Sequence, residues 1–438
     1  MKQLPLVLAA LLGAVFPLRA AEPVARPNII FILSDDVGLG NLSCYGGDKF
    51  KTPQLDALAQ SGTRFEHCYA TPLCGPTRCL FLTGRYPFRT GLINNHSHNA
   101  ISPAREVMIP TVLKQAGYAT AQAGKWGQMC LGPGEWGFDE YLVFPGSGRY
   151  WRAQTSFYTQ NGKRKELPAG VYLPELMHGF VVDFIQRHQA QPFFVYYAMS
   201  QMHGPIVRTP ESRAGGNLYA ENNATMDKLV GRLVAELDRL GLREKTLIVF
   251  SGDNGTAGSA NKATVDGRPL SGHKATMLEG GSRVPLIASW PGTLPAGKLS
   301  RDLIDFSDFF ATFAELAGAK LPEGVKVDGR SFAAQLRGQT GQPREWAYVE
   351  LDGKFYVRTA DWKLNQAGEL FDMSGAPFVE KLVTANAQTA AALAAREHLH
   401  AVLSELNPSP RQAGDAVKAK PPKTKQQRQE KKTKKRGG

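Results

Sequence analysis

Short runs of apolar residues, bounded by polar ones, alternate along the chain with segments whose apolar residues recur at helical spacing. The short runs predict strands that are buried on both faces, and the spaced segments predict helices. The predicted strands are residues 28–34, 118–123, 193–199, 247–250 and 284–288, and the predicted helices are residues 52–62, 109–116, 224–240 and 308–317. This alternation indicates βαβ units and a mostly parallel α/β sheet that helices cover on both faces.

The first predicted helix has its own start and stop signals. Thr52 precedes Pro53, and we expect the Thr52 hydroxyl group to cap the N-terminus of the helix. Gly62 follows the last apolar position, and we expect it to end the helix.

The N-terminus has the pattern of a secretory signal. A positive start at Lys2 precedes an apolar run, residues 4–18, and small residues follow Arg19. The run is shorter than the ~20 residues that a membrane-spanning helix needs, and an uncleaved N-terminal anchor is the alternative. We therefore expect a periplasmic or secreted protein without a transmembrane segment. In that oxidising setting an odd number of cysteines leaves at least one outside any intramolecular disulfide; the five are Cys44, Cys68, Cys74, Cys79 and Cys130.

The pattern changes after residue 345. Short apolar runs separated by Asp-Gly or Ala-Asp pairs predict an antiparallel meander at 345–372, and a helix is expected at 387–406. Beyond Pro408 the chain has almost no apolar residues, which is typical of disorder. We therefore expect a signal peptide (1–21), a large catalytic domain (22–343), a small C-terminal α+β domain (344–407) and a disordered basic tail (408–438).

The net charge of +13 belongs mostly to that tail. From Lys418 to the end there are eight Lys, two Arg and one Glu, so the tail holds nine of the thirteen net positive charges. A nucleic-acid-binding domain would show such charge on its folded elements, and nucleic acid is therefore not an expected partner. The tail is a solvated extension or, as a second hypothesis, attracts polyanionic glycans.

Polar side chains follow four of the predicted strands. Asp35 and Asp36 follow the first strand, Asp253 and Asn254 follow another, and Lys125 and His203 follow two more. Ligands of open parallel sheets bind at the carboxyl ends of the strands. Carboxylate and amide oxygens favour Ca²⁺ or Mg²⁺ over Zn²⁺. Helix caps or turns are the alternative for each pair alone.

The most specific signal is Cys74-Gly-Pro-Thr-Arg78, followed by Thr83-Gly-Arg85. It resembles the signature of the formylglycine-dependent sulfatases of the alkaline phosphatase superfamily, which reads Cys-x-Pro-Ser-Arg and then Thr-Gly-Arg. The resemblance covers residues 26–373 and includes further landmarks in family order. These are Asp35-Asp36, residues 52–59, Gly124-Lys125-Trp126, Gly137-Phe138-Asp139, His203-Gly204-Pro205, Asp253-Asn254-Gly255, Lys274 and the segment from Glu279 to Pro285.

The resemblance implies an alkaline-phosphatase-like fold and an enzyme that hydrolyses sulfate esters. A formylglycine-generating maturation enzyme would oxidise Cys74 to an aldehyde, whose hydrated form attacks sulfur. The resemblance implies Ca²⁺ ligands at Asp35, Asp36, Cys74, Asp253 and Asn254. It also implies that Arg78 orients the formylglycine, that Lys125 and Lys274 hold the sulfate oxygens, and that His203 protonates the departing alcohol.

The sequence departs from the family pattern at three positions. Thr77 replaces the motif Ser, and Cys79 stands where a small residue is usual. Gly127 stands where the family has the His that returns the diol to the aldehyde. We expect an active enzyme with a substitute base, for which the candidates are His96, His98 and His273.

The expected substrate is a sulfated carbohydrate, or an aryl sulfate as a surrogate. The loop at 146–152 and the C-terminal domain are expected to form the rim of the pocket. One alternative is a phosphonate or phosphate ester hydrolase of the same superfamily, although Asn254 stands where a two-zinc phosphatase would need a His ligand. The other alternative is a secreted glycan-binding homologue without activity.

Overall fold

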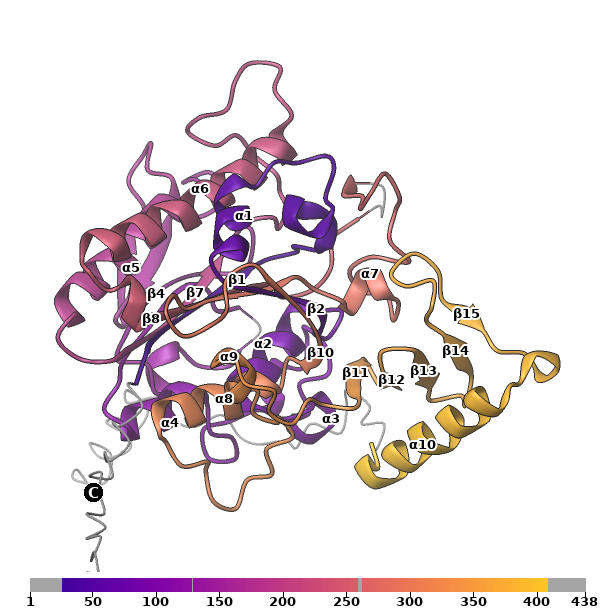
Figure 1. Ribbon diagram of the computed structural model, residues 1–438. Helices are drawn as coiled ribbons and strands as arrows, with labels where there is room; N and C mark the ends of the chain where they lie inside the picture. Colours follow the sequence, from indigo (N-terminus) through magenta and orange to yellow (C-terminus); the bar gives the residue numbers. More distant parts are fainter. Residues whose placement is uncertain (1–25, 128, 259–261, 409–438) are drawn as a thin grey trace, which may run out of the picture.

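The computed structural model describes residues 26–127, 129–258 and 262–408 (Figure 1). The predicted signal peptide and the predicted tail from residue 409 onward lie outside the described residues. Within the described residues, no helix is long and apolar enough to cross a membrane.

Ten strands form one large mixed sheet, which confirms the predicted fold class. In spatial order they are β10 (Lys298–Asp305), β2 (Thr63–Tyr69), β9 (Leu286–Ser289), β8 (Thr246–Gly252), β1 (Asn28–Ser34), β7 (Phe193–Met199), β3 (Ala119–Lys125), β4 (Glu140–Phe144), β5 (Phe157–Gln160) and β6 (Lys163–Glu166). The central strands β8, β1, β7, β3 and β4 are parallel, as is the pair β10 and β2. The β5–β6 hairpin and β9 are antiparallel to their neighbours.

Helices cover both faces of this sheet, as Figure 1 shows. One face is covered by α1 (Pro53–Gln60), α5 (Leu173–His188) and α6 (Leu218–Arg239), and the other by α2 (Cys74–Thr83), α4 (Ile109–Gln115) and α8 (Asp308–Ala317). Alternate side chains of β1 enter the two layers, since Ile29 and Phe31 pack on one side whereas Ile30 and Ile32 pack on the other. A strand with apolar groups on both faces therefore lies at the centre of the molecule.

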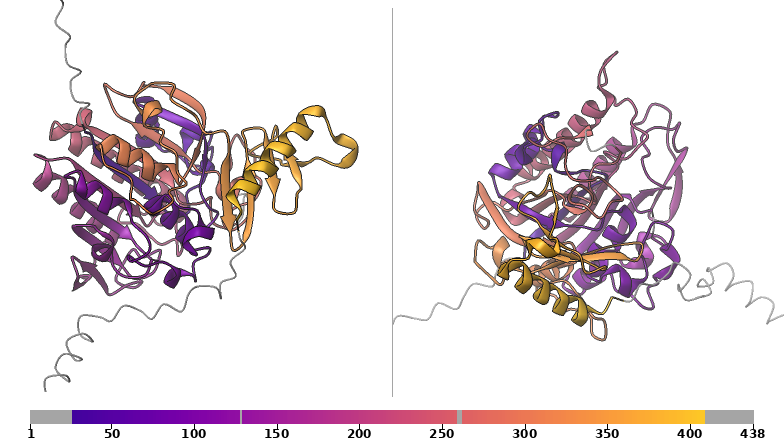
Figure 2. Two further views of the ribbon diagram at one scale, coloured as in Figure 1. Left: turned by 90° about the horizontal axis from the view of Figure 1, so that it is seen from below. Right: turned by 90° about the vertical axis from the view of Figure 1, so that its right-hand side faces the viewer.

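A second, antiparallel sheet follows the large one and confirms the predicted meander. It consists of β11 (Ala347–Leu351), β12 (Lys354–Arg358), β13 (Trp362–Asn365), β14 (Leu370–Asp372) and β15 (Lys381–Leu382). The helix α10 (Ala390–Leu406) packs on it, with the Thr389 hydroxyl group capping its N-terminus. Figure 2 shows this sheet and α10 at one side of the main body.

The short helices among the described residues are α3 (Pro87–Thr90), α7 (Glu279–Ser282), α9 (Ala333–Leu336) and the 3-10 turns Leu39–Asn41, Ser43–Tyr45, His98–Ala100, Pro133–Trp136, Arg243–Lys245 and Ala385–Ala387. Most of them lie in connections between the larger elements.

The predicted cap at the start of α1 is wrong, whereas the predicted end is confirmed, since Ser61 is the C-cap and Gly62 follows it. The Thr52 hydroxyl oxygen accepts a hydrogen bond from Ser43 N at 3.0 Å and makes no cap bond to α1. The Asp227 carboxylate on α6 accepts instead from Gln54 N and Leu55 N. A Cβ atom at Gly62 would lie 2.1 Å from a carbonyl oxygen of β9, so this glycine is required for close packing.

The periodicity did not indicate several elements. Every residue of α2 is buried, so that helix has no polar face, and β2 and β10 are rich in polar residues. The helix α6 begins at Leu218 rather than at residue 224, because Asn217 caps it and the buried amides of Asn222 and Asn223 interrupt the apolar pattern. The strand predicted at 284–288 is β9, at 286–289.

Candidate active site

Two neighbouring strands bring four oxygen-bearing residues together. In the parallel pair β1 and β8, Ser34 lies opposite Gly252, so Asp35-Asp36 and Asp253-Asn254 follow at the same level of the sheet. Asp36 N donates a hydrogen bond of 3.0 Å to Asp253 Oδ1. Asp36 has a left-handed backbone with φ of 60°, which turns the chain immediately after the strand.

Cys74 faces these carboxylates from the first residue of α2. Its Sγ lies 3.5 Å from Asp35 Oδ1 and 3.9 Å from Asp36 Oδ1. One ligand atom each from Asp35, Asp36, Cys74 and Asp253 lie within 4.8 Å of one another, and all four residues are buried. Burial, and next the charge of Asp253, raise the pKa of the Cys74 thiol, so the unmodified side chain is not a reactive thiolate.

The donor set of this cluster fits a hard cation. Asn254 Nδ2 donates to Asp36 Oδ1 and to Gly255 O, each at 2.9 Å. Asn254 Oδ1 is buried without a hydrogen-bond partner, although buried acceptors are normally satisfied. Three carboxylates and one unsatisfied amide oxygen are ligands of the kind that Ca²⁺ prefers. The cluster could therefore hold a divalent cation.

Three basic side chains compensate the three carboxylates. Lys125 Nζ lies 2.6 Å from Asp35 Oδ2, and Lys274 Nζ lies 2.5 Å from Asp36 Oδ1. The third pair joins Arg78 to Asp253. Burial, the largest influence, would raise the pKa of Asp35, but Lys125, Arg78 and His203 together outweigh it and the pKa is lowered. The Asp35 carboxylate is therefore charged and available to a cation.

Arg78 binds its carboxylate through two nitrogen atoms. Its Nε and Nη2 donate to Asp253 Oδ2 at 3.1 and 2.7 Å, and its Nη1 donates to the Tyr196 hydroxyl group at 2.9 Å. The sequence did not indicate a role for Tyr196, because this residue lies within the apolar strand β7 and no motif includes it. These bonds hold Arg78 one helical turn after Cys74 on the same helix.

His203 follows β7 by four residues. Its Nδ1 lies 2.6 Å from Gly204 O. A carbonyl oxygen only accepts, so Nδ1 carries the proton and Nε2 is free for a ligand. The imidazole is also one of the groups that lower the pKa of Asp35, which indicates that it lies near that carboxylate. Tyr150 fixes this segment, since its hydroxyl group donates to His203 O at 2.6 Å.

The loop at 146–152, which was predicted to form the rim of the pocket, contacts both His203 and Gly127. A Cβ atom at Gly148 would lie 2.9 Å from His203 Nδ1, and one at Gly127 would lie 3.0 Å from Gly146 O. The loop therefore passes over the backbone position where the family pattern has a His.

The structure does not single out a substitute base. His96 and His98 are exposed, and His273 Nδ1 lies 2.8 Å from Lys274 O. Thr77 has a structural contact, because its hydroxyl group donates to Thr71 O at 2.9 Å. All five cysteines lie in the described part of the chain, and none of them forms a disulfide.

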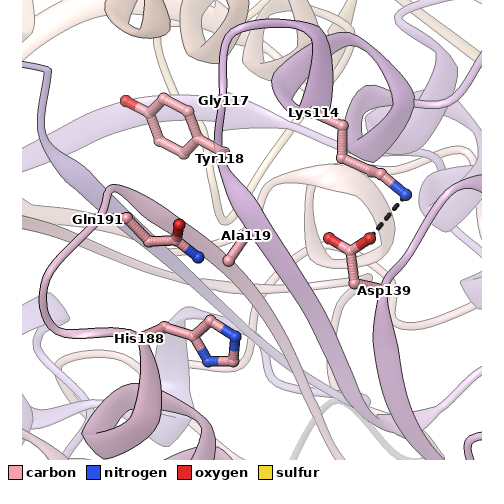
Figure 3. Close-up of a pocket in the computed structure, with 7 residues that line it drawn as sticks. All are labelled: Lys114, Gly117, Tyr118, Ala119, Asp139, His188 and Gln191. Carbon is pink, nitrogen blue, oxygen red and sulfur yellow. Dashed lines mark ion pairs between the residues drawn. The ribbon is translucent and has the colours of Figure 1, made fainter.

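A hollow of about 300 Å³ lies at the opposite edge of the sheet (Figure 3). Its lining comes from the amino ends of β3 and β4 and from the end of α5, whereas the carboxylates follow the carboxyl ends of strands. The lining residues are Lys114, Gly117, Tyr118, Ala119, Asp139, His188 and Gln191. This hollow is therefore separate from the candidate active site.

Comparisons with known proteins show which family the chain resembles. Residues 27–319 match the family model described as Sulfatase. The chain is 35% identical over 385 residues to the N-acetylgalactosamine-6-sulfatase of Canis lupus familiaris, an alignment that covers 79% of this chain and 73% of the relative.

Solved structures share the fold. The crystal structure of Ps i-CgsB superposes with a TM-score of 0.74 at 28% identity, covering 87% of this chain and 92% of the other. The phosphonate monoester hydrolase of Agrobacterium radiobacter has a TM-score of 0.66 at 20% identity, covering 87% and 95%, and shows the fold alone. With its family match over the large sheet and relatives that are themselves sulfuric ester hydrolases, this chain belongs to the sulfatase family.

Proposed function

We propose that this enzyme hydrolyses sulfate esters of carbohydrates with a formylglycine at position 74 and a calcium ion held by Asp35, Asp36, Asp253 and Asn254. The observation that supports this most strongly is the convergence of Asp35, Asp36 and Asp253 on Cys74, with Asn254 hydrogen-bonded to Asp36. The relative from Canis lupus familiaris is named for a sulfated sugar, which supports a carbohydrate substrate.

Position 74 is where the nucleophile would act. Cys74 Sγ occupies the place that the aldehyde oxygens of formylglycine would take, beside Asp35 and Asp36. The hydrated aldehyde would supply a hydroxyl nucleophile, and the calcium ion would supply positive charge that lowers the pKa of that hydroxyl group. Position 74 also begins α2, and the N-terminus of a helix favours a bound anion.

The two lysines have a dual role in this proposal. In the structure, Lys125 and Lys274 balance the negative charges of Asp35 and Asp36. A divalent cation would take over that compensation, so both ammonium groups could turn to the sulfate oxygens. Arg78 stays on Asp253 and Tyr196 and orients the residue at position 74.

His203 protonates the oxygen of the departing alcohol in this proposal. Because Nδ1 donates to Gly204 O, the imidazolium form presents its second proton at Nε2. Gly148 and Tyr150 hold this ring and its backbone in place.

A group other than residue 127 must remove the proton that regenerates the aldehyde, and we propose that the enzyme turns over with such a substitute base. Pre-steady-state kinetics of the converted enzyme test this step. We expect continuous release of the alcohol. A single burst equal to the enzyme concentration, followed by no turnover, would overturn it.

The decisive experiment combines mass spectrometry with an ester assay. We expect the peptide that contains position 74 to carry the aldehyde, and Cys74→Ala to abolish hydrolysis of an aryl sulfate. Unmodified thiol in the secreted chain would favour the inactive glycan-binding alternative. Faster hydrolysis of an aryl phosphonate than of the matched aryl sulfate would favour the phosphonate alternative. A screen of defined sulfated sugars would then identify the substrate.

We further propose export of the chain and removal of residues 1–21, on the basis of the apolar run at 4–18. We also propose that the catalytic domain ends at residue 343 and the C-terminal domain at residue 407. N-terminal sequencing of the mature protein tests the cleavage, and a chain that retains Met1 would contradict it.

A further inference from the structure

Lys274 lies in the segment 271–279, and both ends of this segment are hydrogen-bonded to the second sheet. Ser271 N donates a hydrogen bond of 2.9 Å to Pro377 O, and Glu279 N donates one of 2.8 Å to Glu380 Oε1. Both acceptors lie in the connection between β14 and β15. The segment therefore takes part of its conformation from the C-terminal sheet, more than 100 residues further along the chain.

Glu380 forms a buried ion pair that extends this anchor. Lys363 Nζ, on β13, pairs with Glu380 Oε2, and their side chains are only 4% and 2% exposed. Lys363 Nζ also donates to Met277 O at 3.3 Å and lies 4.8 Å from the centre of the Tyr356 ring. A buried pair with additional hydrogen bonds has one favoured geometry, so it holds the segment at Met277 and at Glu279.

A second cluster holds the C-terminal end of the same segment. Glu279, the first residue of α7, pairs with Arg358 on β12 and accepts a hydrogen bond of 3.1 Å from the Tyr69 hydroxyl group. Arg283 Nη1 lies 3.4 Å from Glu279 Oε2. Because Tyr69 belongs to β2 of the large sheet, this cluster joins the two sheets directly behind the segment.

The middle of the segment, at Lys274, contacts the large domain. Its backbone N donates to Thr256 O at 3.1 Å, and Ala275 N donates to Pro72 O at 2.8 Å. Its ammonium group reaches Asp36. Lys274 thus lies between the large sheet, where the site is built, and the anchors on the second sheet.

We infer that Glu380 and Lys363 are positioning residues for Lys274: the second sheet holds the backbone of this segment where the Lys274 ammonium group reaches Asp36 and, in the proposed function, the sulfate oxygens. This inference rests on the proposed function, in which Lys274 contacts sulfate. It gives the C-terminal sheet a role in the reaction, although none of its described residues is among the predicted site residues.

The test replaces the ion pair as a unit. A single buried charge left unpaired destabilises a fold, whereas a neutral pair of similar volume does not. The variant is therefore Lys363→Met with Glu380→Leu, made in the full-length matured enzyme. We expect kcat/KM for an aryl sulfate to fall at least about tenfold, as is usual for residues that orient a contacting group. The variant should still unfold in one cooperative transition, with a midpoint that falls less than in Glu380→Leu alone, which leaves Lys363 unpaired.

A double-mutant comparison separates positioning from a general structural effect. In a Lys274→Ala background the same pair should cause no further loss of kcat/KM, because the residue through which it acts is absent. Where Lys274→Ala leaves no measurable turnover, the comparison uses the dissociation constant for inorganic sulfate. Glu405→Gln on the exposed face of α10 is the control and should match the wild type.

Wild-type kcat/KM in the Lys363→Met/Glu380→Leu variant, or an equal loss in both backgrounds, would overturn the inference. If the paired variant does not fold, Glu380→Gln replaces it, and its loss of kcat/KM is again compared between the wild-type and the Lys274→Ala backgrounds. Absence of turnover in the wild-type enzyme would instead overturn the proposed function, and the sulfate-binding comparison would still decide the role of Glu380.

Discussion

Lys125 Nζ donates a hydrogen bond of 2.6 Å to Asp35 Oδ2, and both side chains are fully buried. Burial, the largest influence, would lower the pKa of Lys125, but Asp35, together with Cys74 and Asp253, outweighs it and the pKa is raised. The ion pair thus keeps a carboxylate charged in the interior, where a cation can use it. Both residues have proposed roles in the reaction, and each also keeps the charge of the other stable in the protein interior.

Removal of Lys125 should therefore have an effect that depends on calcium. We expect Lys125→Met to lower the free energy of unfolding by about 3–5 kcal/mol in the presence of a chelator, because the buried Asp35 loses its nearest cation and keeps only Arg78, at 3.9 Å. With saturating Ca²⁺ the loss should be smaller, since the cation compensates Asp35. Urea unfolding with and without Ca²⁺ measures both values.

Lys114→Met is the control for this comparison. Lys114 also pairs with an aspartate, Asp139, but the two side chains are 43% and 38% exposed, and such pairs contribute less than about 1 kcal/mol. An identical loss for Lys125→Met in chelator and in Ca²⁺ would contradict the proposed exchange of partners.

Asp36→Asn should weaken calcium binding without disturbing the backbone. Asn tolerates the left-handed conformation of this residue, but it lacks the charge that Ca²⁺ requires. We expect calorimetry to show at least about a tenfold weaker affinity, and the variant to need more Ca²⁺ for hydrolysis. Asp266→Asn is the matched control, since Asp266 is left-handed as well but exposed; a similar effect of both substitutions would argue against the site.

Chelation should stop hydrolysis in the wild-type enzyme. We expect added Ca²⁺ to restore activity and Zn²⁺ to fail, because the ligands are oxygens and Zn²⁺ prefers nitrogen and sulfur. Initial rates after dialysis against chelator measure this effect. Full activity after complete removal of divalent cations would contradict a catalytic calcium ion.

Conversion of Cys74 should require an unfolded chain. The residue is 1% exposed at the start of α2, so a second enzyme cannot reach it in the folded protein. We expect a formylglycine-generating enzyme to convert a peptide of residues 68–90 and to leave the folded thiol protein unchanged, as measured by mass spectrometry. Equal conversion of both would contradict the buried position. A Thr77→Ser peptide shows whether Thr77 slows the reaction.

Glu350 should make stability depend on pH. Burial raises the pKa of this carboxyl group from 4.5 to about 7, although Tyr348 and Phe88 N donate to it. The folded chain thus keeps a proton that the unfolded chain loses. This contribution to stability is complete below about pH 4.5 and decreases by on the order of 3 kcal/mol as the pH rises through 7.

Glu350→Gln preserves the acceptor and removes the titration. We expect its free energy of unfolding to exceed that of the wild type at about pH 8 and to lose this advantage at about pH 5. Urea unfolding at the two pH values measures the difference, with the exposed Glu405→Gln as control. A constant difference between variant and wild type would contradict the buried titration.

Local pattern was sufficient for the large features of the fold. The runs at 28–34 and 193–199 became β1 and β7 with the predicted bounds, because a strand buried on both faces must be apolar throughout. Elements without a clear pattern of apolar and polar positions were missed. An example is α2, which has no polar face because all of its residues are buried. At Gly62 the sequence pattern correctly indicated a helix end, and the tertiary structure adds a second reason for glycine, which is its contact with β9.

The sequence by itself determined which residue types follow the strands, and hence the cluster of Asp35, Asp36 and Asp253 near Cys74. Only the tertiary structure decided the partners: Lys125 on Asp35, Lys274 on Asp36, and Arg78 on Asp253 and Tyr196. The physical reason is separation along the chain. A strand and the residue that ends it are encoded by neighbouring side chains, whereas a hydrogen bond between residues more than 80 positions apart exists only after the sheet has set their register.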